Sequence, residues 1–122
     1  MNAPAASLLG DAGERLAAKH IKRNGGRVVA RNWRCKMGEV DLVALDDGVL
    51  AFVEVKSKST TDRGEPSEAV HYGKRRKLEV LARQYCCDKR VDDTPVRFDI
   101  VEIVWSKPPQ INWIRGAWLE GE

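Results

Sequence analysis

Residues 40–56 read VDLVALDDGVLAFVEVK, two apolar runs separated by the dipeptide Asp47-Gly48. An Asp-Gly pair between two such runs favours a two-residue hairpin turn. We therefore predict two antiparallel strands, at residues 40–45 and 49–55.

The register of this hairpin brings charged side chains together at one end. Counting back from the turn, Asp41 lies opposite Glu54 and Glu39 lies opposite Lys56. Because side chains alternate across a strand, Asp41, Glu54 and Lys56 share one face. The apolar residues divide between this face, with Val43, Leu45, Leu50 and Phe52, and the other, with Val40, Leu42, Ala44, Ala51, Val53 and Val55. Two apolar faces are typical of central strands covered by helices on both sides.

The flanking segments predict the remaining elements. Apolar spacing and the stop Asn24-Gly25-Gly26 indicate a helix over residues 11–24, and a β-prone run at 27–34 indicates an edge strand. The later elements are a helix at 67–87, a strand at 96–105 and a short strand at 111–114. The order is α-β-β-β-α-β, an α/β fold with a central mixed sheet of four or five strands flanked by helices. We expect one domain over 1–122, with a flexible leader at 1–9 and a tail at 116–122.

Composition limits the class of protein. Hydrophobic residues make up 43% and charged residues 32%, which suits a globular chain with a core. No apolar run approaches the roughly 20 residues of a membrane span. The three cysteines, at 35, 86 and 87, indicate a reducing cytoplasm, and no C-x-x-C pair supports a zinc site.

The net charge of +3 is unevenly distributed, because residues 19–36 hold seven basic side chains (Lys and Arg) and no acidic one. Such a segment favours a polyanionic partner. The alternative is a solvated helix face and edge strand without a partner.

Opposed Asp41 and Glu54 would repel each other unless a cation lies between them. Oxygen ligands of this kind favour Mg²⁺ or Mn²⁺, with the Val55 carbonyl as a third ligand. Metal-assisted phosphodiester hydrolysis uses such a site, and Lys56 would orient or help deprotonate the attacking water. The alternative is that Glu39 and Lys56 form a simple ion pair at a strand end.

Asp41, followed after twelve residues by Glu54-Val55-Lys56, resembles the PD-(D/E)xK nuclease motif, and the element order is similar to the restriction-endonuclease-like fold. Val40 stands where the motif has proline.

The chain also resembles the YraN-type family, which is related to archaeal Holliday-junction resolvases. The likeness runs from Gly13 to Ala117. It rests on Gly13-Glu14-Arg15, Asn32-Trp33-Arg34, Gly38-Glu39-Val40-Asp41-Leu42-Val43, Phe52-Val53-Glu54-Val55-Lys56, Glu68-Ala69-Val70 and Arg97-Phe98-Asp99-Ile100-Val101-Glu102-Ile103. The resemblance implies that Glu14 lies near the metal and that Glu39 supports Lys56 or adds a ligand.

Two positions depart from the family pattern: Lys58, where arginine is commoner, and Gly116, where asparagine is commoner. Lys58 keeps the charge but loses the bidentate fork. Several basic residues are candidates for nucleic-acid contact: Arg15, Arg31, Arg34, Lys58, Lys74 and Arg75.

Two functions remain open at this point. The first is a metal-dependent nuclease acting on DNA, with branched or structured substrates implied only by analogy with the resolvases. The second is a non-catalytic nucleic-acid-binding or scaffold protein that keeps the nuclease fold. A substrate with two-fold symmetry would call for a homodimer, for which the sequence shows no surface.

Overall fold

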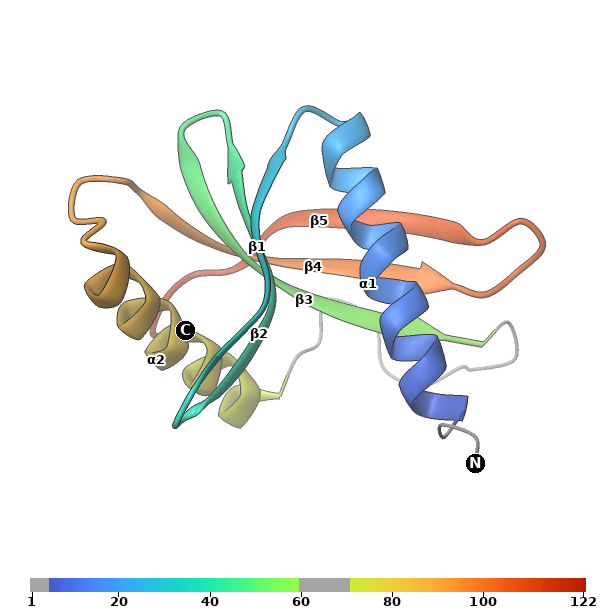
Figure 1. Ribbon diagram of the computed structural model, residues 1–122, viewed down its shortest axis with the longest axis horizontal. Coiled ribbons are helices and arrows are strands. Elements are labelled where there is room, and N and C mark those ends of the chain that lie inside the picture. Colours follow the sequence, from blue (N-terminus) through green and yellow to red (C-terminus); the bar gives the residue numbers. More distant parts are fainter. Residues whose placement is uncertain (1–4, 60–70) are drawn as a thin grey trace.

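The computed structural model describes residues 5–59 and 71–122, which form two helices and a five-stranded sheet (Figure 1). The elements are α1 (Ala5–Arg23), β1 (Arg27–Cys35), β2 (Gly38–Asp46), β3 (Val49–Lys58), α2 (Tyr72–Lys89), β4 (Val96–Val104) and β5 (Gln110–Trp118). This is the expected α/β architecture, consistent with a restriction-endonuclease-like fold.

The sheet has the strand order β1-β2-β3-β4-β5, so β1 lies at an edge as predicted. Only the β3–β4 pair is parallel, which makes the sheet mixed. A parallel pair needs a crossover connection, and the segment with α2 supplies it. The sheet is strongly twisted, since β1 and β2 run steeply in Figure 1 while β4 and β5 run almost horizontally.

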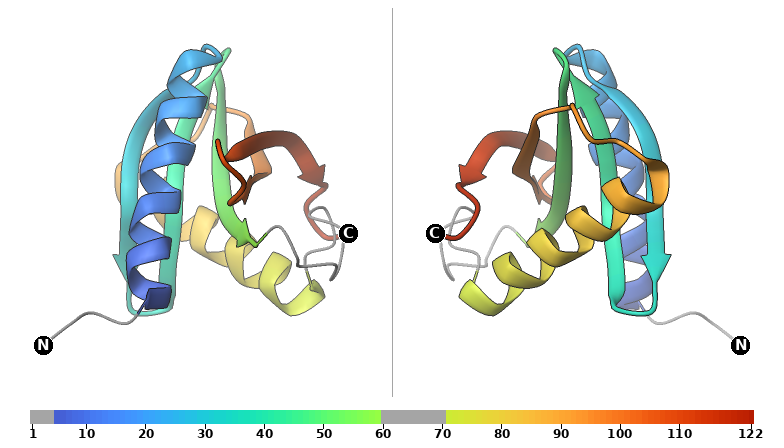
Figure 2. Two further views of the ribbon diagram at one scale, coloured as in Figure 1. Left: turned by 90° about the vertical axis from the view of Figure 1, so that its right-hand side faces the viewer. Right: turned by 90° about the vertical axis from the view of Figure 1, so that its left-hand side faces the viewer.

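The predicted hairpin register is confirmed from the turn outward: Asp46 pairs with Val49, and the ladder continues to Leu42 and Val53. Successive side chains of these strands then pack alternately into two hydrophobic cores, one on each side of the sheet. The core under α2 includes Val43, Leu50, Phe52, Phe98 and Ile100, and the core under α1 includes Leu42, Ala44, Ala51, Val53, Val101 and Ile103. Figure 2 shows the two helices on either side of the sheet.

The predicted face of Val40 is wrong. Val40 packs in the α2 core together with Val43, whereas Leu42 packs in the α1 core. The strand alternation of β2 therefore changes at Asp41. The neighbouring residue of β1, Asn32, has a left-handed φ of 49°, which asparagine tolerates better than most residues. A local distortion of both strands thus surrounds Asp41.

Regular secondary structure reaches into both end segments. Helix α1 begins at Ala5, inside the segment predicted as a flexible leader over 1–9, and residues 1–4 lie outside the described residues. Alanine and leucine in this segment favour a helix. Strand β5 continues to Trp118, which shortens the tail predicted at 116–122, because the Trp118 ring is buried and stacks on Phe98 at 5.4 Å.

Helix α2 begins at Tyr72, so the helix predicted over 67–87 is wrong at His71, which is the N-cap and has a non-helical ψ of 144°. Residues 67–70, with the motif Glu68-Ala69-Val70, lie outside the described residues. The two helices that the structure does describe both fall short of a membrane span in length or apolar content.

Candidate metal and catalytic site

Three carboxylates from different parts of the chain meet beside the distorted stretch of β2. One carboxylate oxygen each from Glu14, Glu39 and Asp41 lies within 4.8 Å of the others. Oxygen atoms in such an arrangement are ligands for a hard divalent cation.

Gly13 allows α1 to bring Glu14 to this point. A β-carbon at Gly13 would lie 2.9 Å from Ser57 Oγ and 3.4 Å from Ile103 Cδ1, so a larger residue would push the helix away from the sheet. Glu14 is the next residue, and the Asn32 side chain forms a hydrogen bond with its carboxylate. The distorted residue of β1 therefore orients an acid of α1.

Asp41 links β2 and β3 where their ladder ends. The last pair is Leu42 with Val53, and beyond it the main-chain N–H of Val55 donates to Asp41 Oδ2 at 2.9 Å. A carboxylate thus takes the place of a main-chain acceptor. Because the N–H and C=O of a strand residue point to the same edge, the Val55 carbonyl also points to the β2 side of β3.

The surroundings of Asp41 disfavour its charge. Burial and then the negative charge of Glu54 raise the pKa of Asp41 from 3.8 to about 7, while the Val55 N–H acts in the opposite direction. Burial likewise raises the pKa of Glu14, against the hydrogen bond from Asn32. A divalent cation bound to these carboxylates would favour their ionised form and so displace protons from them.

Glu54 lies beside Asp41 but outside the group of three acids. Glu54 lies two residues after Phe52, so its side chain is on the α2 side of the sheet. Its carboxyl group forms a hydrogen bond with that of Asp41 and an ion pair with Lys74 Nζ at 3.0 Å. Lys56 follows two residues later on the same face and is half-buried. The catalytic and metal-binding roles of Asp41, Glu54 and Lys56 stay predictions.

The predicted pairing of Glu39 with Lys56 is wrong. Glu39 is the register partner of Arg34 across β1 and β2, and its carboxylate accepts an ion pair from Arg34 Nε at 2.9 Å. The β2–β3 ladder ends at Leu42 and Val53, so strand pairing does not place Glu39 opposite Lys56. Its place in the group of three acids makes it a candidate ligand alongside Glu14.

The six basic residues predicted to contact nucleic acid fall into two groups. Three of them pair with carboxylates: Arg34 with Glu39, Lys74 with Glu54, and Lys58 with Glu102 at 3.0 Å. The side chains of the other three lie on different elements: Arg15 is exposed on α1, Arg31 is exposed on β1, and Arg75 lies over the Tyr72 ring at 5.9 Å. Two of the residues predicted to contact phosphate, Arg34 and Lys74, thus form ion pairs with acids of the site.

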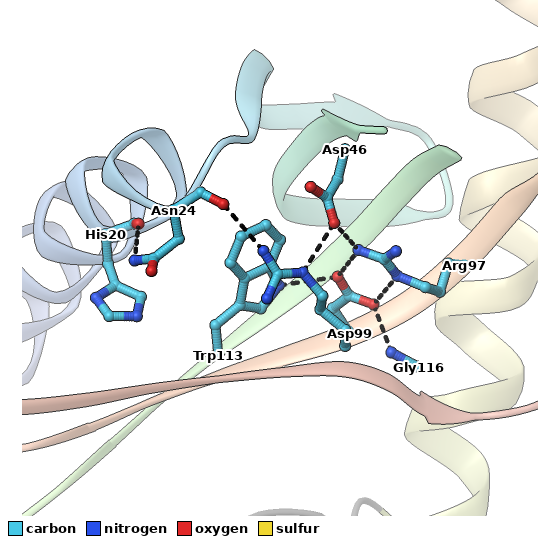
Figure 3. Close-up of polar contacts among 8 residues, drawn as sticks. His20, Asn24, Asp46, Arg97, Asp99, Trp113 and Gly116 are labelled. Carbon is cyan, nitrogen blue, oxygen red and sulfur yellow. Dashed lines mark hydrogen bonds and ion pairs between the residues drawn. The ribbon is translucent and has the colours of Figure 1, made fainter. Parts of the chain in front are cut away.

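A second polar cluster, away from this site, was missed by the sequence analysis (Figure 3). Asp99 is fully buried and accepts hydrogen bonds from Arg97, from the Trp113 indole and from the main-chain N–H of Gly116, at 2.8–2.9 Å. Arg97 also bonds Asp46. The available signal was an Arg and an Asp two residues apart on an otherwise apolar strand. All these hydrogen bonds join residues of β2, β4 and β5, so we assign this cluster to stabilising the sheet.

Fold and site together define an α/β domain with a carboxylate cluster where its central hairpin opens. The chain matches the model of the Uncharacterised protein family UPF0102 over residues 13–103. It belongs to this family, which is the YraN-type family that the sequence resembles.

Relatives from several bacteria share most of the chain. A UPF0102 protein of Solibacter usitatus (strain Ellin6076) is 48% identical over 110 residues, which cover 88% of this chain and 83% of the relative. A UPF0102 protein of Symbiobacterium thermophilum is 45% identical over a match that covers 78% of this chain and 80% of the relative. A UPF0102 protein of Paenarthrobacter aurescens (strain TC1) is 39% identical over a match that covers 93% of this chain and 95% of the relative.

Proposed function

We propose that this protein is a metal-dependent nuclease that hydrolyses phosphodiester bonds of DNA. The observation that supports it is the convergence of Glu14, Glu39 and Asp41, with Glu54 against Asp41 and Lys56 two residues further along β3. Burial and the neighbouring acids disfavour the charges of Asp41 and Glu14, a cost that a bound cation would offset. The resemblance to the PD-(D/E)xK motif points to the same chemistry.

The donor set suits Mg²⁺ or Mn²⁺, because every candidate ligand offers oxygen and none offers sulfur or imidazole. Asp41, Glu54 and Glu14 would hold the ion, with the Val55 carbonyl and Glu39 as further ligands. When bound, the ion supplies charge stabilisation at the phosphate and lowers the pKa of a water molecule.

The cations of the chain have two tasks in this proposal. Lys56 orients the attacking water and assists its deprotonation from β3. Arg34 and Lys74 neutralise Glu39 and Glu54 in the metal-free protein. A divalent ion on those carboxylates would release both side chains, which then reach phosphate oxygens of the substrate.

DNA as the substrate rests on the basic run at 19–36 and on the resemblance, and a branched DNA rests on the resemblance alone. Action as a homodimer applies only if the substrate has two-fold symmetry. A reducing cytoplasm follows from the use of cysteine, and Cys35, Cys86 and Cys87 are free thiols in the structure.

Cleavage of end-labelled DNA, including branched forms, tests this proposal. We expect the wild-type protein to cut with Mg²⁺ or Mn²⁺ and Lys56→Met to cut roughly 10²–10⁴-fold more slowly, the usual contribution of a proton-transfer group. Lys107→Met, at an exposed lysine, is the matched control. Salt-sensitive binding without metal-dependent cutting would instead support a non-catalytic binding protein.

A further inference from the structure

A recess with a volume of about 170 Å³ opens directly beside the proposed site. It lies between the β2–β3 hairpin and α2, and Glu39 and Glu54 form one wall. Its other lining residues come from α2 and from the end of β5: Lys74, Lys77, Leu78, Leu81 and Trp118. The recess is therefore continuous with two of the acids that would hold the metal.

The lining combines an apolar floor with cationic side chains. Leu78, Leu81 and the Trp118 ring are buried and supply the floor. The stem of Lys77 passes close to Gly38, where a β-carbon would lie only 3.0 Å from Lys77 Cε. Gly38 thus leaves room for this lysine beside the recess. An apolar floor next to cations suits a flat heteroaromatic ring attached to a phosphate.

We infer that this recess binds one unpaired nucleobase, that of the nucleotide next to the phosphate being cleaved. A paired base is stacked on both faces and cannot enter a recess bounded by a helix and a hairpin. The substrate class is then a nucleic acid with an unpaired nucleotide at the cleavage point, as in a bulge, a flap or a branch. This inference rests on the proposed function.

The test separates binding in the recess from cleavage. A short DNA duplex with one unpaired 2-aminopurine is titrated with the full-length Lys56→Met variant and Mn²⁺, beside the same duplex with an abasic spacer at that position. We expect the base to raise affinity about tenfold, within the usual range for stacking of one base, and the 2-aminopurine emission to change on binding. Equal affinity for the two duplexes would overturn the inference.

Three variants locate the effect. In the same background Leu78→Phe fills the recess and should remove the preference for the base, whereas Val80→Phe, at a 43%-exposed position of the same helix, should keep it. Lys77→Ala, which leaves the core intact, should also weaken the emission change. A preference that survives both Leu78→Phe and Lys77→Ala would overturn the assignment to this recess. Absence of cleavage by wild type, with the preference intact, would refute only the nuclease proposal.

Discussion

The main-chain N–H of Val55 donates to the carboxylate of Asp41 at 2.9 Å, in the place where the next rung of the β2–β3 ladder would lie. The same carboxylate lies against Glu54 and is largely shielded from water, so its pKa rises to about 7. Asp41 therefore supports the strands best when it holds a proton or a cation. This coupling between fold and site leads to the first prediction.

Without metal, the stability of the protein should fall as the pH rises from about 4 to about 7. The native protein keeps the Asp41 proton over this window, whereas the unfolded chain releases it near 3.8. The stabilisation from the Asp41 proton is thus fully present below the pKa of the unfolded chain. It is lost as the pH rises through the pKa of the folded protein, at no more than about 1.4 kcal/mol per pH unit. Urea unfolding of wild type and Asp41→Asn measures it, and an equal slope in the variant would contradict the assignment to Asp41.

Gly13→Val should be less stable than Gly10→Val by about 1–3 kcal/mol, the usual cost of overpacking. Both substitutions put the same residue into α1, but a β-carbon has open space at Gly10 and meets Ser57 and Ile103 at Gly13. The displaced helix should also carry Glu14 away and weaken Mn²⁺ binding. If the two variants unfold at the same urea concentration, α1 does not need the close approach.

Asp99→Asn should destabilise the protein by about 3–5 kcal/mol, because it removes the buried carboxylate that neutralises the half-buried guanidinium of Arg97. Asp99 is fully buried, so water cannot replace the lost interaction. Affinity for Mn²⁺ should not change in the folded variant. Asp93→Asn, at an exposed acid, is the control for stability, and a loss of metal affinity in Asp99→Asn would show that the two polar clusters are coupled.

Gly116→Ala should cost about 1–2 kcal/mol, since Gly116 has a left-handed φ of 63°. Gly116→Asn should cost less, because asparagine tolerates this conformation. Open space surrounds the position, with Arg97 Cδ the nearest atom at 3.9 Å from an added β-carbon, so backbone conformation alone is measured. Thermal unfolding ranks the three proteins, and equal costs for the two variants would contradict the assignment of the cost to the left-handed backbone.

The hairpin could be predicted from sequence because its determinants are local. The Asp47-Gly48 turn sets the register, and strict alternation from Leu42 onward assigns the faces. The face of Val40 could not be predicted, because the change at Asp41 depends on the conformation of Asn32 in a different strand.

The site could be predicted only in part, for the same reason. The closeness of Asp41 and Glu54 follows from the hairpin, and Glu14 came from a family resemblance. The actual partner of Glu39, Arg34, depends on which strand stays paired after β2 and β3 diverge. Asp99 looked like an ordinary strand residue, since its partners Trp113 and Gly116 lie on β5, far along the chain.

Calorimetric titration of Mn²⁺ tests the metal site most directly. Wild type, Asp41→Ala and Glu54→Ala are compared after each is shown to be folded, with Asp93→Asn as the control. We expect wild type and the control to bind the ion, and both alanine variants to bind at least about tenfold more weakly, as expected for loss of a ligand. Equal binding by all four proteins, or no binding by wild type, would contradict the assignment of these carboxylates to a metal.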